Sequence, residues 1–117
     1  MTKRHLLGKR GEKLAKAYFL NQRFEIVCEN YRYRRFEIDL IVKKGGLLVF
    51  VEVKTRSSIR FGYPEETLSV QQENRIRKAA EEYIFTSGWQ GKIRFDIISI
   101  VVRKNRAVLR HFVDALY

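Results

Sequence analysis

Two apolar segments separated by a pair of glycines constrain this chain more than any other part of it. Residues 36–41 and 49–56 are rich in apolar and β-branched side chains and read as strands, and residues 45–46 between them are both glycine. A glycine pair in this position is typical of a β-hairpin, because glycine tolerates the positive φ of tight turns. A two-residue or a four-residue loop centred on these glycines places Asp39 directly opposite Glu52. The sequence therefore predicts a hairpin that brings two carboxylates side by side.

A carboxylate pair of this kind needs a positive partner. Opposite residues of a hairpin share one face, with Cβ atoms roughly 4.5–5.5 Å apart. Lys54 lies two residues beyond Glu52, so its side chain points to the same face. Two ionised carboxylates at that separation repel each other unless a proton, a cation or a metal ion compensates them. A divalent ion fits best, with Lys54 as a second positive charge, and this is the geometry of an active site.

The composition fits one globular domain over residues 1–117. The chain is 45% hydrophobic and 32% charged, and no apolar run approaches the roughly 20 residues that cross a bilayer. We therefore expect a soluble protein with no membrane partner. The basic N-terminus enters a charged helix, so no secretion signal is expected. Cys28 is the single cysteine, which excludes an internal disulfide and favours a reducing, cytoplasmic location.

The net charge of +11 indicates a polyanionic partner, of which nucleic acid comes first. The basic residues are spread over the whole chain, which suits a broad phosphate-contacting surface better than a short targeting peptide. General basicity or ribosome association is the alternative explanation.

The order of expected elements predicts an α/β fold, with a mixed β-sheet flanked by helices in the order α-β-β-β-α-β(-β). A capping-box pattern at Ser69 and Gln72 predicts the start of the second helix, and Gly88 its end. Ile26 and Cys28 are expected on one face of the first extended segment. The expected elements are a helix at 6–21, an extended segment at 24–34, the hairpin at 36–55, a loop at 57–68, a helix at 69–88, and strands at 92–102 and 107–113.

Asp39, Glu52 and Lys54 suit phosphodiester hydrolysis, which needs an activated water, neutralised charge at phosphorus and a stabilised leaving oxygen. Mg²⁺ typically binds through one or two carboxylates together with water and substrate phosphate. We expect Mg²⁺ or Mn²⁺ on Asp39 and Glu52, with the carbonyl of Val53 as a further ligand. Lys54 would then orient or deprotonate the attacking water. The competing interpretation is a solvated, salt-bridging strand edge.

Two further glutamates are candidates for this site. Glu12 lies at the rim of the apolar stripe of the first helix. Its carboxylate either reaches the sheet and completes the metal site or stays solvated beside neighbouring lysines. Glu37 would oppose Lys54 in the same hairpin register, either orienting that lysine or forming an ordinary cross-strand ion pair.

These residues resemble those of a known family. The chain resembles the YraN (UPF0102) family of small bacterial proteins and, more broadly, the PD-(D/E)XK nuclease superfamily with its restriction-endonuclease-like fold. The motifs Glu-Ile-Asp-Leu-Ile and Phe-Val-Glu-Val-Lys-Thr-Arg carry much of the likeness. Matching positions are 8–12, 15, 37–41, 50–56, 61–62, 79–80, 83, 94–96, 111–112 and 115.

The resemblance implies a catalytic set. The family is similar in fold to archaeal Holliday-junction resolvases, which cut branched DNA as dimers with magnesium. By that similarity Glu12 takes the position of the helix glutamate. Asp39 and Glu52 take the metal positions, and Lys54 takes that of the catalytic lysine.

Substrate contacts are expected from Arg10, Arg56, Arg60 and Gln72. Arg56 and Arg60 belong to a basic, aromatic segment that follows Lys54. This segment could clamp a nucleic-acid backbone. Alternatively, its aromatic residues could simply anchor the loop. Gln72 stands where the family usually has lysine, so a phosphate contact there would lose its charge. A second departure, Phe36 in place of a common glycine, leaves the metal set intact.

The remaining polar residues have simpler interpretations. Asp96 is expected to be a buried acid hydrogen-bonded to the backbone or to Arg94. His5 and His111 are too isolated for a zinc site.

The leading hypothesis is a metal-dependent endonuclease acting on DNA, with branched or damaged forms in repair or recombination as candidate substrates. The alternative is a non-catalytic nucleic-acid-binding module with the same fold. The charge supports both, whereas an intact set of acids is needed only for catalysis. A homodimer is a further expectation, because a duplex offers two strands to cut and each small domain would hold one site.

Overall fold

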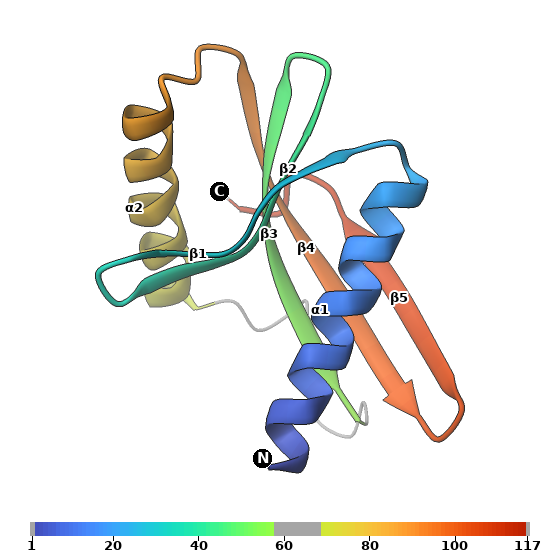
Figure 1. Cartoon of the computed structure of the whole chain (residues 1–117). Helices are drawn as coiled ribbons and strands as arrows, with labels where there is room; N and C mark the ends of the chain where they lie inside the picture. Colours follow the sequence, from blue (N-terminus) through green and yellow to red (C-terminus); the bar gives the residue numbers. More distant parts are fainter. Residues whose placement is uncertain (1, 58–68, 117) are drawn as a thin grey trace.

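The computed structural model describes residues 2–57 and 69–116, which form one five-stranded sheet with a helix packed on each face (Figure 1). The elements are α1 (Lys3–Asn21), β1 (Glu25–Tyr33), β2 (Phe36–Lys44), β3 (Leu47–Arg56), α2 (Val70–Ser87), β4 (Lys92–Arg103) and β5 (Arg106–Phe112). The strands lie in the order β1-β2-β3-β4-β5, with β3 and β4 parallel and all other neighbours antiparallel. The predicted α/β class, the mixed sheet and the order of elements are confirmed. Within these described ranges, no helix is both long enough and apolar enough to cross a membrane.

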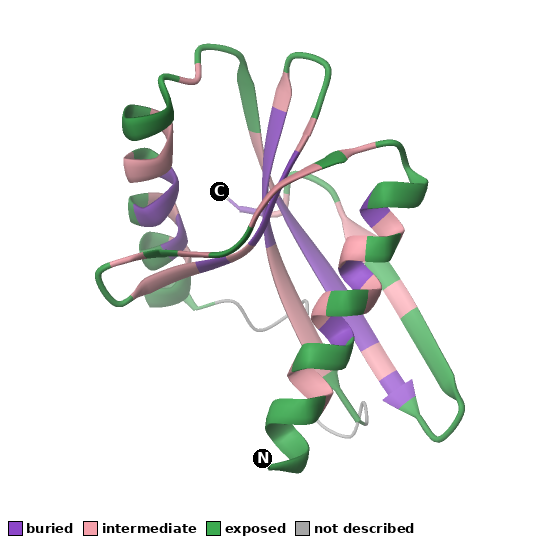
Figure 2. Cartoon of the chain, in the orientation of Figure 1, coloured by how far each residue is buried: buried purple, intermediate pink, exposed green. Residues whose placement is uncertain are grey.

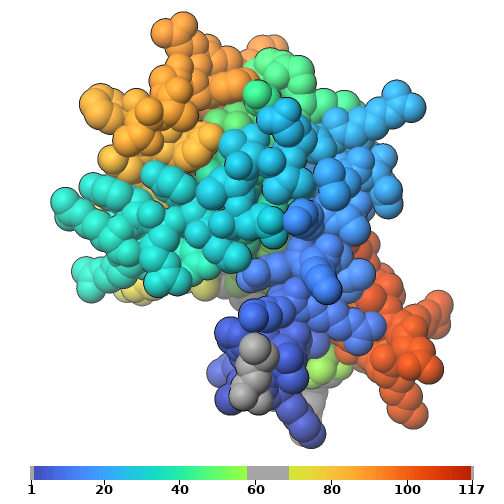
Figure 3. Space-filling view, in the orientation of Figure 1, coloured from blue at the N-terminus to red at the C-terminus, as the bar shows by residue number. Residues whose placement is uncertain are grey.

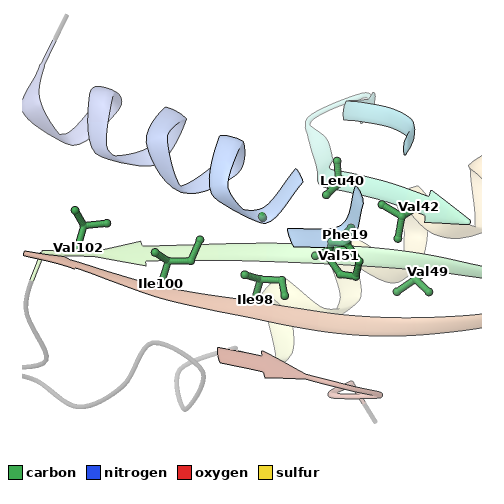
Figure 4. Close-up of a cluster of buried hydrophobic side chains, with 9 residues drawn as sticks. Phe19, Leu40, Val42, Val49, Val51, Ile98, Ile100 and Val102 are labelled. Carbon is green, nitrogen blue, oxygen red and sulfur yellow. The ribbon is translucent and has the colours of Figure 1, made fainter. Parts of the chain in front are cut away.

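Strand β3 divides the core into two layers, because its alternate side chains point to opposite faces of the sheet. Val49 and Val51 point toward α1 and pack in one cluster with Phe19 of that helix (Figure 4). Leu48 and Phe50 pack toward α2. Figure 2 shows this buried zone running through the middle of β3 and β4, while the outer surfaces of both helices are exposed.

Both helices begin at side-chain caps. Ser69 and Gln72 form the predicted capping box of α2, and Gly88 ends that helix with φ 72° in the left-handed region. The first helix starts at Lys3, earlier than predicted, because the Thr2 hydroxyl accepts a hydrogen bond from the N–H of His5.

Two side chains of strand β1 lie on different faces of the sheet from those predicted. Ile26 pairs with Val42 and Cys28 with Ile41, so the register shifts between them by one residue. Ile26 consequently packs in the α1 layer and Cys28 in the α2 layer. The expectation that both side chains share one face was wrong, because a bulge interrupts the two-residue alternation.

Strands β2 and β3 are paired near their turn but separate farther from it. These strands pair from Leu40 and Val51 to their turn, in the predicted register, and Gly45 adopts φ 59° in that turn. Beyond Leu40, β2 stays paired with β1 as far as Phe36, while β3 stays paired with β4 as far as Arg56. Figure 1 shows the β1–β2 hairpin bending away from β3 toward α2. The two acids predicted to face each other are the first residues beyond this junction.

Candidate active site

Asp39 lies one residue beyond the end of the β2–β3 ladder, and its side chain takes over the contact with β3. Oδ2 of Asp39 accepts a 2.7 Å hydrogen bond from the backbone N–H of Val53. The N–H and C=O of one strand residue point to the same side of the strand. The Val53 carbonyl, predicted as a metal ligand, is therefore directed toward the same gap as Asp39.

Glu52 forms a hydrogen-bonded carboxyl pair with Asp39. Burial raises the pKa of Glu52 to about 9, and the neighbouring Asp39 charge and the hydrogen bond to it act in the same direction. At neutral pH the metal-free pair therefore holds a proton on Glu52. A proton shared by two adjacent carboxyl groups marks a place where a cation would be favourable.

Lys54 lies next to this pair, two residues beyond Glu52 on β3. Burial lowers the pKa of its ammonium group, and the Glu52 carboxylate opposes that effect without cancelling it. The lowered pKa brings the amine closer to the range in which it exchanges a proton with water.

The pairing of β3, β4 and β5 places two unpredicted residues in the row of Lys54. Ser99 is its register partner on β4, and Arg110 is the partner of Ser99 on β5. Ser99 is buried, and its Oγ has no hydrogen-bond partner in the part of the chain that the structure describes. No local signal in the sequence marks these residues, because the row is created by strands far apart along the chain.

Glu12 is held near the carboxyl pair by the close packing of α1 on β3. Gly11 approaches Thr55 so closely that an added Cβ would lie 1.8 Å from its Oγ1. Burial raises the pKa of Glu12 and the Asp39 charge raises it further, whereas a hydrogen bond with Asn30 lowers it. Sequence analysis missed Asn30, which has φ 52° at an irregular point of β1.

The acids near the junction form a two-carboxylate site. Across residues 2–57 and 69–116, no three His, Cys, Asp or Glu side chains gather closely enough to hold one metal ion. Mg²⁺ nevertheless requires only one or two carboxylates when water and substrate phosphate supply the other oxygens. Asp39, Glu52 and the Val53 carbonyl are hard oxygen donors on one side of β3, so their chemistry fits such an ion.

A cleft of about 770 Å³ opens beside these residues. Its walls are the N-terminal half of α1, residues 52–57 of the β3 segment, and Gln72 of α2. In the space-filling view the outline is indented between the β1–β2 hairpin and the N-terminal turns of α1 (Figure 3). Glu12, Lys54, Arg56 and Gln72 all line the cleft, so the structure brings these candidates together.

Arg10, another predicted nucleic-acid contact, does not line the larger cleft. Arg10 is exposed and lines a smaller cleft of about 500 Å³, which shares Glu12 with the larger one. Arg60, with most of the loop predicted at 57–68, lies outside the described residues.

Glu37 is separated from Lys54 by the parting of the strands. It forms a cross-strand ion pair with Arg32, its register partner on β1, at 3.1 Å. The predicted pairing of Glu37 with Lys54 was therefore wrong, whereas the ordinary cross-strand ion pair exists with another residue.

Asp96 is a structural acid, as predicted. It is 1% exposed and accepts 2.8 Å hydrogen bonds from both Nε and Nη2 of Arg94. His111 Nε2 lies 2.6 Å from it, and the N–H of Asp114 donates a 3.0 Å bond. Since an ionised carboxylate only accepts, Nε2 of His111 is the donor. The network ties β5 and the C-terminal segment to β4.

Comparison with known proteins places the chain in a family. The protein-family model described as "Uncharacterised protein family UPF0102" matches residues 11–100. This span contains Glu12, Asp39, Glu52 and Lys54. The chain belongs to the UPF0102 family. The UPF0102 protein of Chlorobium phaeobacteroides is 42% identical over 118 residues, covering 95% of this chain and 93% of the relative. The UPF0102 protein of Christiangramia forsetii is 38% identical over 117 residues, covering 100% and 98%. That of Dictyoglomus thermophilum is 45% identical over 105 residues, covering 88% of each. The relationship therefore spans both core layers and the candidate site.

Proposed function

We propose that this UPF0102 chain is a metal-dependent endonuclease of the PD-(D/E)XK type that hydrolyses DNA phosphodiesters, with Mg²⁺ or Mn²⁺ as cofactor. The observation that carries the proposal is the half-buried Asp39–Glu52 pair at the point where strands β2 and β3 separate. Burial and the neighbouring carboxylate raise the pKa of Glu52 to about 9. A stability-driven design would not place two acids there, because each destabilises the ionised form of the other.

The residues of the cleft have distinct roles in this proposal. Asp39, Glu52 and the Val53 carbonyl would hold the ion, which would supply Lewis-acid stabilisation of charge on the phosphate. Lys54 would orient the attacking water and accept its proton, a role supported by the lowered pKa of its amine. Arg56 and Gln72, at the cleft wall, would contact flanking phosphates.

Branched or damaged DNA is the proposed substrate class, in repair or recombination. The net charge of +11 supports a nucleic-acid partner, whether the DNA is branched or damaged. A homodimer would supply one site for each strand of a duplex.

A non-catalytic nucleic-acid-binding module is the second candidate. One observation favours it: no three metal-binding side chains gather within residues 2–57 and 69–116. Such a module would bind DNA through the same basic surface, and cation removal would leave that binding unchanged.

Cleavage of supercoiled, flapped and four-way DNA with Mg²⁺ or Mn²⁺ separates the two functions. We expect metal-dependent cutting that Asp39→Asn and Lys54→Ala abolish. The matched controls Glu81→Gln and Lys92→Ala remove an exposed acid and an exposed lysine outside the cleft, and they should cut normally. Tight binding without cutting of any of these substrates would reject the enzyme and favour the module.

A further inference from the structure

The surface of α1 carries cations that no acid of the described residues neutralises. Within the described residues, only Lys16 of this helix has an acidic partner, Glu29 at 3.0 Å. An ion pair or hydrogen bond to the remaining basic side chains of α1 is absent from that part of the structure. These cations are Lys3, Arg4, Lys9, Arg10 and Lys13.

The start of α1 is arranged against the stability of the helix. The positive end of a helix dipole favours acidic side chains in the first turn. This helix has none there and instead begins with Lys3 and Arg4. Both line the larger cleft, so the dipole and the two side chains concentrate positive potential at its mouth. That arrangement favours an anion in the cleft.

The two clefts are joined along α1. Lys3 and Arg4 line the larger cleft, Lys9 and Lys13 line the smaller one, and Glu12 belongs to both. The acids of the smaller cleft are Glu12 and Glu29, and Glu29 is already paired with Lys16. Glu52 and Lys54 thus lie in a cleft lined by Lys3 and Arg4, and this cleft shares Glu12 with the cleft lined by Lys9 and Lys13.

Gly8 keeps the middle of this surface open. A Cβ built on Gly8 would have no atom within 4 Å, unlike the tightly packed Gly11 of the next turn. Its backbone can therefore approach a bulky ligand closely. From Lys3 to Lys13 the helix extends about 15 Å, at 1.5 Å per residue. Phosphates of one duplex strand advance about 3.4 Å each along the axis, so about four of them match this length.

We propose that α1 is a track for the sugar-phosphate backbone of one strand of duplex DNA. Lys3 and Arg4 hold phosphates on one side of the Asp39–Glu52 pair, and Lys9 and Lys13 hold those on the other. The track rests on the proposed function in one respect, namely that the phosphate between these contacts is the one cleaved.

The salt dependence of binding tests the track without any chemistry. Anisotropy of a labelled duplex of about 20 base pairs is measured in EDTA between about 50 and 200 mM KCl. Each phosphate contact contributes about −0.9 to the slope of log K against log salt. Lys9→Ala/Lys13→Ala should therefore flatten the slope by about 2, and Lys3→Ala/Arg4→Ala by a similar amount.

The matched control also removes two cations. Arg23→Asn/Lys92→Ala changes exposed residues that line neither cleft, and asparagine tolerates the φ of 69° at position 23. Its slope should equal that of the unaltered chain. An unchanged slope in both α1 variants, or an equal loss in the control, would overturn the track.

The outcome is separable from that of the proposed function. Flattened slopes with no cutting of any DNA would leave the track standing and remove the nuclease. Metal-dependent cutting together with unchanged slopes would support the nuclease and reject the track.

Discussion

The backbone N–H of Val53 donates a 2.7 Å hydrogen bond to Oδ2 of Asp39, although the β2–β3 ladder ends at the preceding pair. A side chain thus replaces the backbone acceptor at the point where the strands separate. This substitution turns the acid toward β3, beside Glu52, and leaves the edge of β3 open to the cleft. The parting of the sheet and the carboxyl pair are therefore one structural feature.

The stability of the metal-free protein should fall with rising pH because of Glu52. Its pKa rises from an ordinary 4.5 to about 9 on folding. The corresponding stability is complete below about pH 4.5 and is lost as the pH rises toward 9. The slope from this one group cannot exceed roughly 1.4 kcal/mol per pH unit. Urea unfolding in EDTA should show the decline, and Glu52→Gln should remove it.

The control for this measurement is Glu81→Gln, which removes an exposed carboxylate of α2. Its stability should follow the pH dependence of the unaltered protein. Parallel curves for Glu52→Gln and the unaltered protein between about pH 5 and pH 8 would show that Glu52 is not a protonated member of the pair.

Gly11→Ala should destabilise the fold. The new Cβ would lie 1.8 Å from Oγ1 and 2.8 Å from Cβ of Thr55, so α1 must move off β3. We expect a loss of about 1–3 kcal/mol in thermal or urea unfolding. Gly8→Ala is the matched control, because its Cβ meets nothing within 4 Å. It should stabilise the helix by about 0.5–1 kcal/mol, and a loss as large as that of Gly11→Ala would contradict the packing described.

Asp96→Asn should be among the most damaging single changes. Burial would raise the pKa of Asp96, but hydrogen bonds from His111 and Arg94 hold it below its ordinary value, so the group is ionised. Removing this charge leaves the Arg94 guanidinium partly buried and uncompensated, at a cost of about 3–5 kcal/mol. Glu29→Gln, which breaks the exposed pair with Lys16, should cost under about 1 kcal/mol. Similar losses in urea unfolding for both variants would refute the distinction.

Gln72 can be tested separately as a helix cap and as a cleft residue. Its Oε1 accepts a hydrogen bond from the N–H of Ser69, and Ser69 Oγ accepts one from the N–H of Gln72. Gln72→Glu keeps both bonds, because glutamate serves equally well in a capping box. It also places a negative charge in the cleft, so duplex DNA should bind roughly three- to tenfold more weakly with unchanged stability.

The opposite change is informative for the same residue. Gln72→Lys loses the cap and adds a cation, so stability should fall by about 0.5–2 kcal/mol while DNA affinity rises. Affinities that track stability in both variants would mean that Gln72 acts only as a cap.

Local signals in the sequence predicted much of this fold. The glycine turn determined the register of β2 and β3, and the Ser69–Gln72 pattern and Gly88 determined the bounds of α2. Each of these depends on backbone preferences within a few residues. The facing of Asp39 and Glu52 followed from that register, and it is why the core of the candidate site could be located from the sequence.

The remaining features depend on tertiary pairing. The bulge after Ile26 and the positive φ of Asn30 reverse the side-chain alternation of β1, and no residue type there demands either. The loss of the β2–β3 ladder beyond Leu40 separated Glu37 from Lys54. The row from Lys54 through Ser99 required the parallel pairing of β3 with β4, which no short pattern encodes.

Calorimetric titration with Mn²⁺ tests the central claim most directly, namely that Asp39 and Glu52 together hold a divalent ion. The unaltered protein should bind Mn²⁺, Glu81→Gln should bind it equally well, and both Asp39→Asn and Glu52→Gln should lose the binding heat. Binding that persists unchanged in Glu52→Gln would contradict the account and place the ion elsewhere.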